Sequence, residues 1–450
     1  MKNILLILFS LINLLSYGQA TKDAGSERLG IAEEMEKSMR TELLDKWYPQ
    51  SMDTVYGGFL SSFTFDFKPT GAQDKMIVTQ ARHTWSNAKA SLWFPNTAYF
   101  KTGARHGFLF LKNVMWDKKY GGFYTLVNRQ GQVKNNDIPK NAYGNAFGIY
   151  ASAAYYEASG DTAALNLAKK AFMWLEEHAH DKIYKGYYMH LQTDGTPIHR
   201  TNSVSSMSDL GYKDQNSSIH LLEAFTELYS VWKDDLLRER LQEMLLLIRD
   251  TITTKKGYLV LFFQPDWKPI SFRDSSVASI LQHRNIDHVS FGHDVETAFL
   301  MLEASAALGS KNDTTTLAVA KRMVDHALNN GWDHAIGGFY DEGYYFKNKP
   351  GITIIRDSKN WWAQAEGLNT LSMMAGYFPN DSLHYFEKFK QLWHYAQTYL
   401  IDHVYGDWYE EGLDKEPQRK TALKGHIWKA TYHQFRSLMN CVRRLRESEH

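Results

Sequence analysis

Two pairs of histidine and glutamate occur at the same spacing in the middle of the chain. His220 and Glu223 are three residues apart, and so are His293 and Glu296. Residues three apart on a helix share one face, so each pair would present an imidazole and a carboxylate together. A carboxylate beside an imidazole fixes its tautomer and keeps its pKa in a range useful for proton transfer. The repeated spacing favours acid–base chemistry over two incidental pairs.

Two further polar residues stand in settings that suit a reactive site. His433 lies in a segment that we expect to open the last helix of the chain. Arg82 is an isolated cation in an aromatic setting, where it would either stabilise a developing oxyanion or pair with a carboxylate. A ring of inner helices would bring the helix starts that carry the three histidines toward one cavity.

Aromatic residues are frequent and include a pair of adjacent tryptophans. The aromatic share is 14%, with 13 Trp and 26 Tyr. Trp361 and Trp362, followed by Gln364 and Glu366, form either a sugar-stacking surface with polar groups or a part of the core.

The sequence lacks the patterns of several other chemistries. Paired His and Glu residues can bind a metal, but no further ligand stands at recognisable zinc spacing, so we expect none. Phosphate-binding glycine loops, a nucleophile elbow and a dinucleotide fingerprint are absent. The single cysteine, Cys441, cannot form an intramolecular disulfide, so the fold must depend on core packing.

Charge and hydrophobic composition argue against further classes of protein. The 450 residues include 51 Lys+Arg and 50 Asp+Glu, with a net charge of +1 and no run of five like charges. This balance argues against a nucleic-acid surface or an acidic tail. A hydrophobic share of 44% permits a large core. The elements that must position the candidate residues therefore belong to a folded body.

A glycine–aromatic motif recurs along the chain and indicates six repeats. Its aromatic positions are Phe59, Phe123, Tyr187, Tyr258, Phe339 and Trp408, at intervals of 64 to 81 residues. Two amphipathic stretches lie between successive motifs, for example residues 145–157 and 162–178. A glycine stop and an aspartate N-cap at 158–161 separate these two stretches.

This repeat predicts an all-α fold, the (α/α)6 barrel, with short β-hairpins at one mouth. Each helix pair with its hairpin cannot bury its apolar face alone, whereas a ring of six pairs does so. An open helical solenoid is the alternative, but it would not need a count of six. We expect a single barrel domain over residues 21–450.

The N-terminus has the pattern of a secretory signal peptide, residues 1–20. A short basic start precedes an apolar run from Ile4 to Leu15, and the segment ends in a small-x-small site at Ala20. Thr21 rather than Cys follows, so lipid anchoring is not indicated. We expect a periplasmic or secreted protein that has no membrane contact after cleavage.

Several motifs together resemble the N-acylglucosamine 2-epimerase superfamily, and within it the cellobiose 2-epimerase branch. They lie at residues 216–229, 291–296, 361–366 and 425–433, and further matches occur at 140–143, 155–161 and Arg82. The resemblance covers nearly the whole chain after the signal peptide. It implies the same (α/α)6 barrel and cofactor-free interconversion of a glucose and a mannose unit at C2, through an enediolate.

The resemblance also implies roles for individual residues. His433 and His293 would be the acid–base pair at C2, His220 would assist ring opening, and Glu223 and Glu296 would orient histidines. Sugar oxygens would be bound by Arg82, Tyr143 and Asn216, and the subsites would be shaped by Trp361, Trp362 and Trp428. We expect a small sugar as the partner, no nucleic acid, and a monomer or weak dimer.

Some residues depart from the family pattern. Gln434 stands where Asn is usual, Ala430-Thr431 replaces Cys-Pro, and Phe299 stands where Trp is common. The segment 264–289 is longer than expected and carries Arg273, His283, Arg284 and His288. These departures bear on the identity of the sugar.

Three alternatives remain open from the sequence. An aldose–ketose isomerase would use the same enediolate. A glycoside hydrolase would use the same barrel with a carboxylate pair. A carbohydrate-binding protein without activity would keep the sugar site alone.

Overall fold

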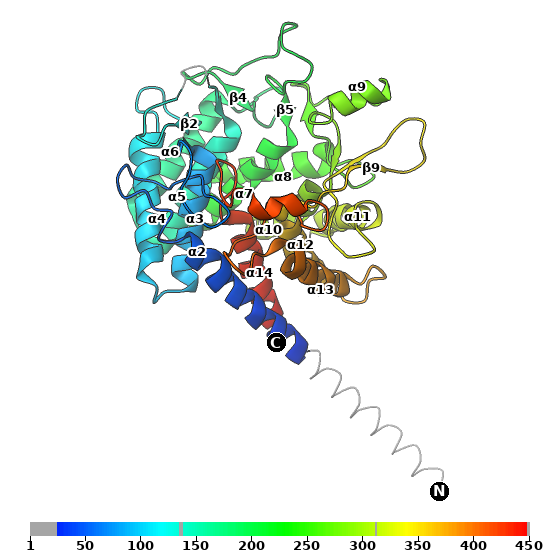
Figure 1. The fold of residues 1–450 in the computed structure, drawn as a ribbon. Coiled ribbons are helices and arrows are strands. Elements are labelled where there is room, and N and C mark those ends of the chain that lie inside the picture. The colour runs from blue at the N-terminus through cyan, green and yellow to red at the C-terminus, as the bar shows by residue number, and fades with distance from the viewer. Residues whose placement is uncertain (1–24, 135–137, 311–312, 448–450) are drawn as a thin grey trace, which may run out of the picture.

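The computed structural model describes residues 25–134, 138–310 and 313–447, so the predicted signal peptide at residues 1–20 lies outside the described part. An inner ring of helices surrounds the centre of the molecule (Figure 1). It consists of α3 (Ile77–Trp93), α5 (Ala142–Ser159), α7 (Gln215–Val231), α10 (Phe291–Ala307), α12 (Trp361–Tyr377) and α14 (Tyr432–Glu447). Each inner helix contacts the next and α14 contacts α3, which closes the ring. The predicted (α/α)6 barrel is confirmed.

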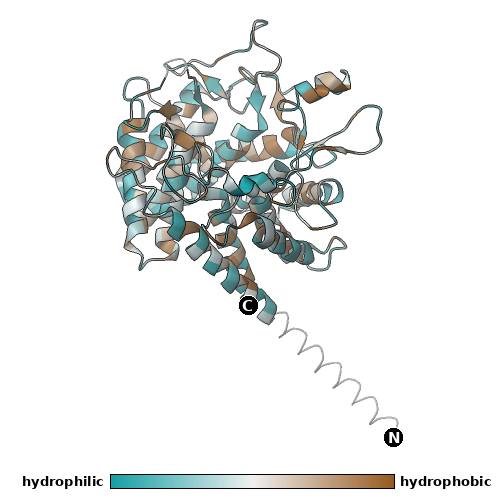
Figure 2. Ribbon diagram, in the orientation of Figure 1, coloured by the Kyte–Doolittle hydropathy of each residue, from teal (hydrophilic) through white to brown (hydrophobic). Residues whose placement is uncertain are grey.

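An outer helix precedes each inner helix along the chain. The outer layer consists of residues 25–37 continued by η1 (Ser38–Leu44) and α2 (Asp45–Trp47), then α4 (Ala98–Phe110), α6 (Thr162–His178), α8 (Asp235–Leu247), α11 (Thr314–Asn330) and α13 (Tyr385–Tyr395). Short π-helical turns extend α4, α8 and α13: η2 (Leu111–Met115), η3 (Ile248–Ile252) and η4 (Ala396–Leu400). Figure 2 shows α13 as largely hydrophilic on the side facing the viewer, as expected of an outer helix.

The break predicted between α5 and α6 is confirmed. Gly160 ends α5 with a φ of 69°, a left-handed conformation that glycine adopts without a steric penalty. The Asp161 side chain then accepts a hydrogen bond from the backbone N–H of Ala163 and caps α6. The two signals end α5 and begin α6.

The glycine–aromatic repeat holds the loops against the inner helices. Phe123 packs on Gly148 of α5 so closely that a Cβ there would lie 2.2 Å from the ring, and Phe339 packs on Gly367 of α12 in the same way. The fourth position differs from the prediction. Leu259 rather than Tyr258 is paired with Thr253 and buried, because the loop of this repeat is one residue shorter than the others.

Short antiparallel strands lie at the N-terminal ends of the inner helices. Strand β1 (Lys75–Met76) pairs with β2 (Leu126–Val127), β3 (Lys140–Asn141) with β4 (His190–Leu191), and β5 (Lys213–Asp214) with β6 (Phe262–Phe263). A three-stranded sheet contains β7 (Val289–Ser290), β8 (Glu342–Tyr344) and β9 (Thr353–Arg356). Single bridges such as Val127 to Val133 close local hairpins, as predicted. The strand pairs also join neighbouring repeats.

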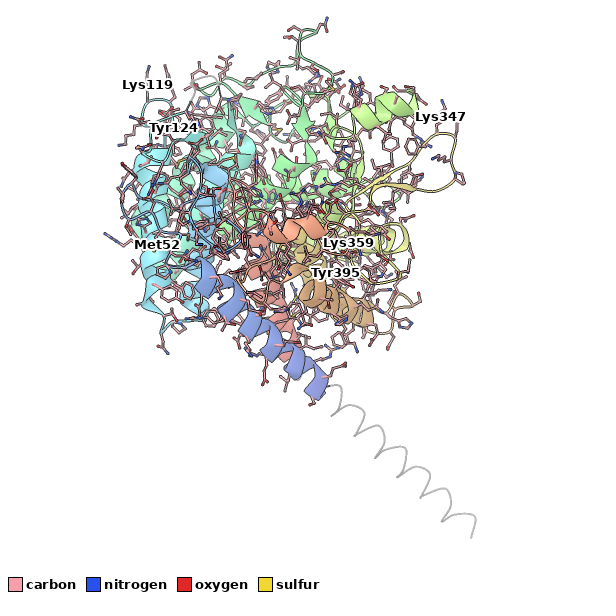
Figure 3. All side chains as sticks on the ribbon, in the orientation of Figure 1. Met52, Lys119, Tyr124, Lys347, Lys359 and Tyr395 are labelled. Atoms are coloured by element: carbon pink, nitrogen blue, oxygen red, sulfur yellow. The ribbon has the colours of Figure 1, made fainter. Side chains whose placement is uncertain are left out.

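A buried ion pair recurs in five of the six repeats. The lysine precedes an inner helix and the aspartate follows an outer one, in the pairs Lys75–Asp53 (2.9 Å), Lys140–Asp117 (2.7 Å), Lys213–Asp181 (2.8 Å), Lys359–Asp333 (2.8 Å) and Lys424–Asp402 (2.8 Å). Figure 3 labels Lys359 beside Tyr395, whose ring centroid is 4.5 Å from the ammonium. Each pair ties a loop to the start of the inner helix that carries site residues.

Two minor elements complete the described chain. Helix α9 (Val277–Gln282) belongs to the long segment 264–289, and η5 (Pro417–Thr421) lies between β9 and α14. Across residues 25–134, 138–310 and 313–447, we find no helix whose length and apolar character would allow it to cross a membrane.

Candidate active site

Ten of the eleven predicted site residues line one cavity. It has a volume of about 200 Å³ and is lined by Arg82, Tyr143, Asn216, His220, His293, Glu296, Trp361, Trp362, Trp428 and His433. The eleventh residue, Glu223, is buried behind His220. The first two turns of the inner helices supply most of these side chains, so the barrel geometry explains why distant segments converge.

His220 is paired with a carboxylate as its spacing predicts. Its Nδ1 lies 2.8 Å from Oε2 of Glu223, and both side chains are almost completely buried. An imidazole that donates Nδ1–H to a carboxylate leaves its Nε2 lone pair free to accept a proton.

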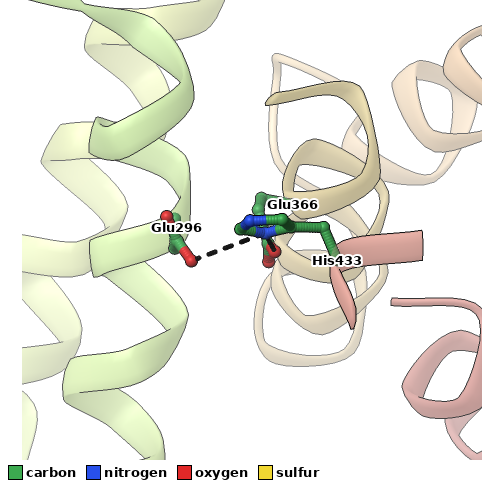
Figure 4. A group of neighbouring side chains, drawn as sticks. All are labelled: Glu296, Glu366 and His433. Carbon is green, nitrogen blue, oxygen red and sulfur yellow. Dashed lines mark hydrogen bonds and ion pairs between the residues drawn. The ribbon is translucent and has the colours of Figure 1, made fainter. Parts of the chain in front are cut away.

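His433 has a carboxylate partner that the sequence analysis did not place in the site. Its Nδ1 lies 2.6 Å from Oε1 of Glu366, whereas Glu296 is 3.9 Å away (Figure 4). Glu366 was noted only as a polar group after the tryptophans. Its position on α12, one turn beyond Trp362, was the available signal, but the contact with α14 is not visible in local spacing.

His293 does not pair with Glu296, which corrects the second expected pair. Its Nδ1 is 3.0 Å from the Ser290 hydroxyl and 3.3 Å from the Gln215 side-chain nitrogen. Glu296 turns instead toward Arg436, whose Nη2 donates to its Oε1 at 2.8 Å. The two i, i+3 motifs therefore have different geometries.

Arg436 connects three buried glutamates and was also missed from the sequence. Its guanidinium hydrogen bonds to Glu223, to Glu296 and, at 2.7 Å, to Glu366. It is 3% exposed and lies three residues after His433, one helical turn along α14. The helical spacing relative to His433 was the signal that sequence analysis overlooked.

One group of side chains in the described residues could in principle hold a metal ion. Potential ligand atoms of Glu296, Glu366 and His433 lie within 4.8 Å of one another. However, Nη2 of Arg436 already hydrogen bonds to Oε1 of both glutamates. A guanidinium at this position would repel a cation, so the donor set does not fit a metal well.

Arg82 and Tyr143 form a polar part of the cavity wall. Arg82 donates from Nη2 to the Tyr143 hydroxyl at 3.1 Å and from Nη1 to the Trp428 carbonyl at 2.8 Å. Its Nε is buried and has no hydrogen-bond partner among the described residues. The guanidinium is thus fixed in place and retains a donor.

Indole rings enclose the cavity. Trp362 lies near two of the histidines, with ring centroids 4.6 Å from His293 and 5.9 Å from His433. Trp361 is buried, whereas Trp428 is 49% exposed and lies at the rim. Flat rings with polar neighbours suit the stacking of a pyranose.

Burial keeps the histidines neutral. Desolvation, assisted by neighbouring positive groups, lowers the pKa of His293 to about 3 and places the pKa values of His220 and His433 well below the usual range. Burial raises the pKa of Glu296 to about 8, against the effect of Arg82. Neutral imidazoles at neutral pH are able to accept protons.

Two departures from the family pattern lie outside the cavity wall. The Gln434 amide donates to Asp407 at 3.0 Å and is fully buried. The Phe299 ring lies 5.0 Å from the Arg436 guanidinium carbon and is also fully buried. Neither residue lines the cavity, so both act on its supporting structure.

The fold and site together define an (α/α)6-barrel enzyme whose central cavity is lined by three histidines and three tryptophans. The chain belongs to the N-acylglucosamine 2-epimerase family, whose sequence model matches residues 57–437. It is 28% identical to a cellobiose 2-epimerase of Ruminococcus albus, covering 91% of this chain and 99% of the relative. A D-mannose isomerase of Thermobifida fusca is 25% identical, covering 68% and 70% of the two chains. The solved structure of cellobiose 2-epimerase from Spirochaeta thermophila matches with a TM-score of 0.79 and 27% identity, covering 94% of this chain and 99% of that one.

Proposed function

We propose that this protein is a cofactor-independent sugar 2-epimerase acting on the glucose or mannose unit at the reducing end of a disaccharide or a monosaccharide. The observation that carries the proposal is the pair of neutral histidines, His293 and His433, beside the same indole of Trp362. Inversion at C2 removes the proton from one face and returns it to the other, and two separate proton carriers at one sugar-sized cavity serve the two faces without rotation of the intermediate.

The group that contacts Nδ1 of each histidine is the basis on which we assign its task. His433, supported by Glu366, acts as the base that removes the C2 proton and later releases it to solvent. His293 takes up a proton from solvent and delivers it to the opposite face. A positioned imidazole contributes about 10²–10⁴-fold to such a transfer. Arg82 stabilises the enediolate oxygen, and removal of such a donor typically costs about 3 kcal/mol. His220, supported by Glu223, assists opening of the cyclic sugar.

An aldose–ketose isomerase is the second candidate, supported by the relative named D-mannose isomerase. It would use the same enediolate but return the proton to C1. A glycoside hydrolase is less compatible with the geometry. Its two carboxylates must face each other across the glycosidic bond, whereas Glu296 and Glu366 hydrogen bond to the same Arg436 nitrogen.

Incubation with cellobiose in D₂O tests this function. We expect a product of unchanged connectivity, with the mannose configuration at the reducing end and deuterium at C2, detected by NMR and mass spectrometry. A ketose would indicate the isomerase, and monosaccharides would indicate the hydrolase. Retention of all substrate hydrogen during turnover would reject the enediolate mechanism.

We also propose that the protein is exported, on the basis of the N-terminal pattern alone. The test is N-terminal sequencing of the protein isolated from a cell fractionation. A start at Thr21 in the periplasmic fraction supports export, and an intact Met1 in the cytoplasm rejects it.

A further inference from the structure

The recurring lysine binds the backbone of the loop beside it. In the second repeat, the Lys140 ammonium bonds to Asp117 and to the carbonyls of Gly121 and Thr193, which belong to its own loop and to the next repeat. The cavity that this lysine lines has a volume of about 20 Å³, and a neighbouring hollow of about 390 Å³, which the lysine does not line, shares Ile138 and Thr193 with it.

The fourth repeat lacks both members of the ion pair. Thr254 stands at the position of the aspartate and Val289 at that of the lysine. Their joint loss is consistent with the cost of leaving one buried charge unpaired. The space left by the lysine is now a cavity of about 200 Å³, the same volume as the catalytic cavity.

Three tyrosines and three polar side chains line this fourth-repeat cavity: Tyr258, Tyr344, Tyr345, Arg273, Asp287 and His288. The displacement of Tyr258 from the buried anchor position, which Leu259 occupies, places it here. The rings of Tyr258 and Tyr345 are stacked with centroids 5.4 Å apart. The wall therefore combines tyrosine rings with aliphatic and polar side chains.

Hydrogen bonds hold two of the tyrosines in place and leave other polar groups of the wall available to a ligand. The Tyr344 hydroxyl donates to Asp287 at 2.8 Å, and the Tyr345 hydroxyl lies 2.8 Å from Nε2 of His326. In the described part of the chain, no hydrogen bond engages the Tyr258 hydroxyl or the Arg273 guanidinium. A ligand would find fixed rings and unused donors.

The fourth-repeat cavity is separate from the catalytic one. No residue lines both. Val289 of β7 lines the fourth-repeat cavity, whereas the next residue, Ser290, contacts His293. Successive side chains of a strand point to opposite faces, so β7 separates the two cavities.

We propose that the fourth-repeat cavity is a second saccharide-binding site. It binds one pyranose unit and does not catalyse a reaction on it. The choice of a sugar as ligand rests on the function proposed above. Tyrosine side chains offer both apolar ring surface and hydroxyl groups to a pyranose, and Arg273 with Asp287 matches its hydroxyls. Asp287 disfavours a phosphate, and the Lys256 ammonium, 3.9 Å from the Tyr345 ring centroid, disfavours an organic cation.

The other repeats supply the variant that tests the proposal. Thr254→Asp combined with Val289→Lys should refill the fourth-repeat cavity as five repeats fill theirs. The probe is methyl β-cellobioside, which cannot open to an aldehyde and so is not turned over. Calorimetric titration should give two binding sites on the parental protein and one on the refilled variant. Equal stoichiometry in the two folded proteins would overturn the proposal.

A second variant decides the matter if the refilled protein does not fold. Arg273 is exposed at the cavity, so Arg273→Ala should leave the fold intact and weaken the second site by about tenfold or more. Arg284→Ala is the matched control, because Arg284 is an exposed arginine of the same segment that does not line the cavity. Equal binding by both variants would overturn the proposal.

Epimerisation of cellobiose, measured on the same proteins, separates the two proposals. If the parental protein forms no epimer but binds two probe molecules, the proposed function is rejected and the second binding site is retained. If it forms the epimer but binds only one probe molecule, the second site alone is rejected.

Discussion

At the scale of single residues, the three histidines differ in what holds Nδ1. His220 and His433 each face a carboxylate, whereas His293 faces a hydroxyl and an amide. A carboxylate stabilises the imidazolium that forms when a base accepts a proton. His293 lacks this support and is the stronger acid once protonated, which suits the delivery of a proton.

Replacement of Glu366 tests this difference. Glu366→Gln keeps the size of the side chain but replaces the carboxyl group beside His433 with an amide, so kcat should fall by about 10²-fold or more while the fold is retained. The measurement is the rate of C2 proton exchange, with circular dichroism to check the fold. Glu411→Gln is the matched control, since Glu411 is a buried carboxylate that does not line the cavity. Equal exchange rates in the two variants would reject the role of Glu366.

Removal of metals tests whether Glu296, Glu366 and His433 bind a metal ion that the activity needs. Because Arg436 already bonds to both glutamates, we expect full activity after exhaustive EDTA treatment. The measurement is the epimerisation rate before and after treatment, with metal content determined by mass spectrometry. Loss of activity that one divalent ion restores would give these three residues a ligand role.

At the scale of elements, sequence periodicity predicted what depends on local spacing. The α5–α6 break follows from Gly160 and Asp161, and the His220–Glu223 contact follows from one helical turn. The contact of Glu366 with His433 joins two helices, and no local spacing reveals such a contact. Tyr258 was assigned wrongly because a loop shortened by one residue shifts the anchor to its neighbour.

The lysine–aspartate pairs lead to a prediction about the hairpins. Lys140→Met leaves Asp117 buried without its partner, which should lower the free energy of unfolding by about 3–5 kcal/mol. Lys140→Val with Asp117→Thr reproduces the fourth repeat and should cost less than the single change. Urea denaturation measures both variants. A double variant less stable than Lys140→Met would contradict this explanation of the fourth repeat.

At the scale of the whole molecule, ring closure and site formation are one event. Helix α14 closes the barrel against α3 and also carries His433 and Arg436, while α3 carries Arg82. The proposed base, His433, and the proposed oxyanion-stabilising cation, Arg82, therefore come together only when the last helix docks. The same closure buries the ionisable groups, so the stability of the molecule depends on pH.

His83 isolates one part of this pH dependence outside the cavity. Burial lowers its pKa to about 3, and its Nδ1 lies 2.8 Å from the Tyr48 hydroxyl. Below pH 6.5 the unfolded chain binds a proton at this position that the folded chain does not bind, so folding becomes less favourable as pH falls. His83→Phe removes the effect and keeps a ring against Phe59, on which His83 is stacked.

The difference in unfolding free energy between parental and His83→Phe proteins should therefore change with pH. We expect a constant difference above pH 6.5 and a change of about 1.4 kcal/mol per pH unit, in favour of the variant, as pH falls from 6.5 toward 3. Urea denaturation at a series of pH values measures it. Epimerisation serves as the control, because His83 does not line the catalytic cavity. A difference that stays constant from pH 7 to 4 would show that His83 protonates equally well in the folded and unfolded chains, and burial would then not be what sets its charge.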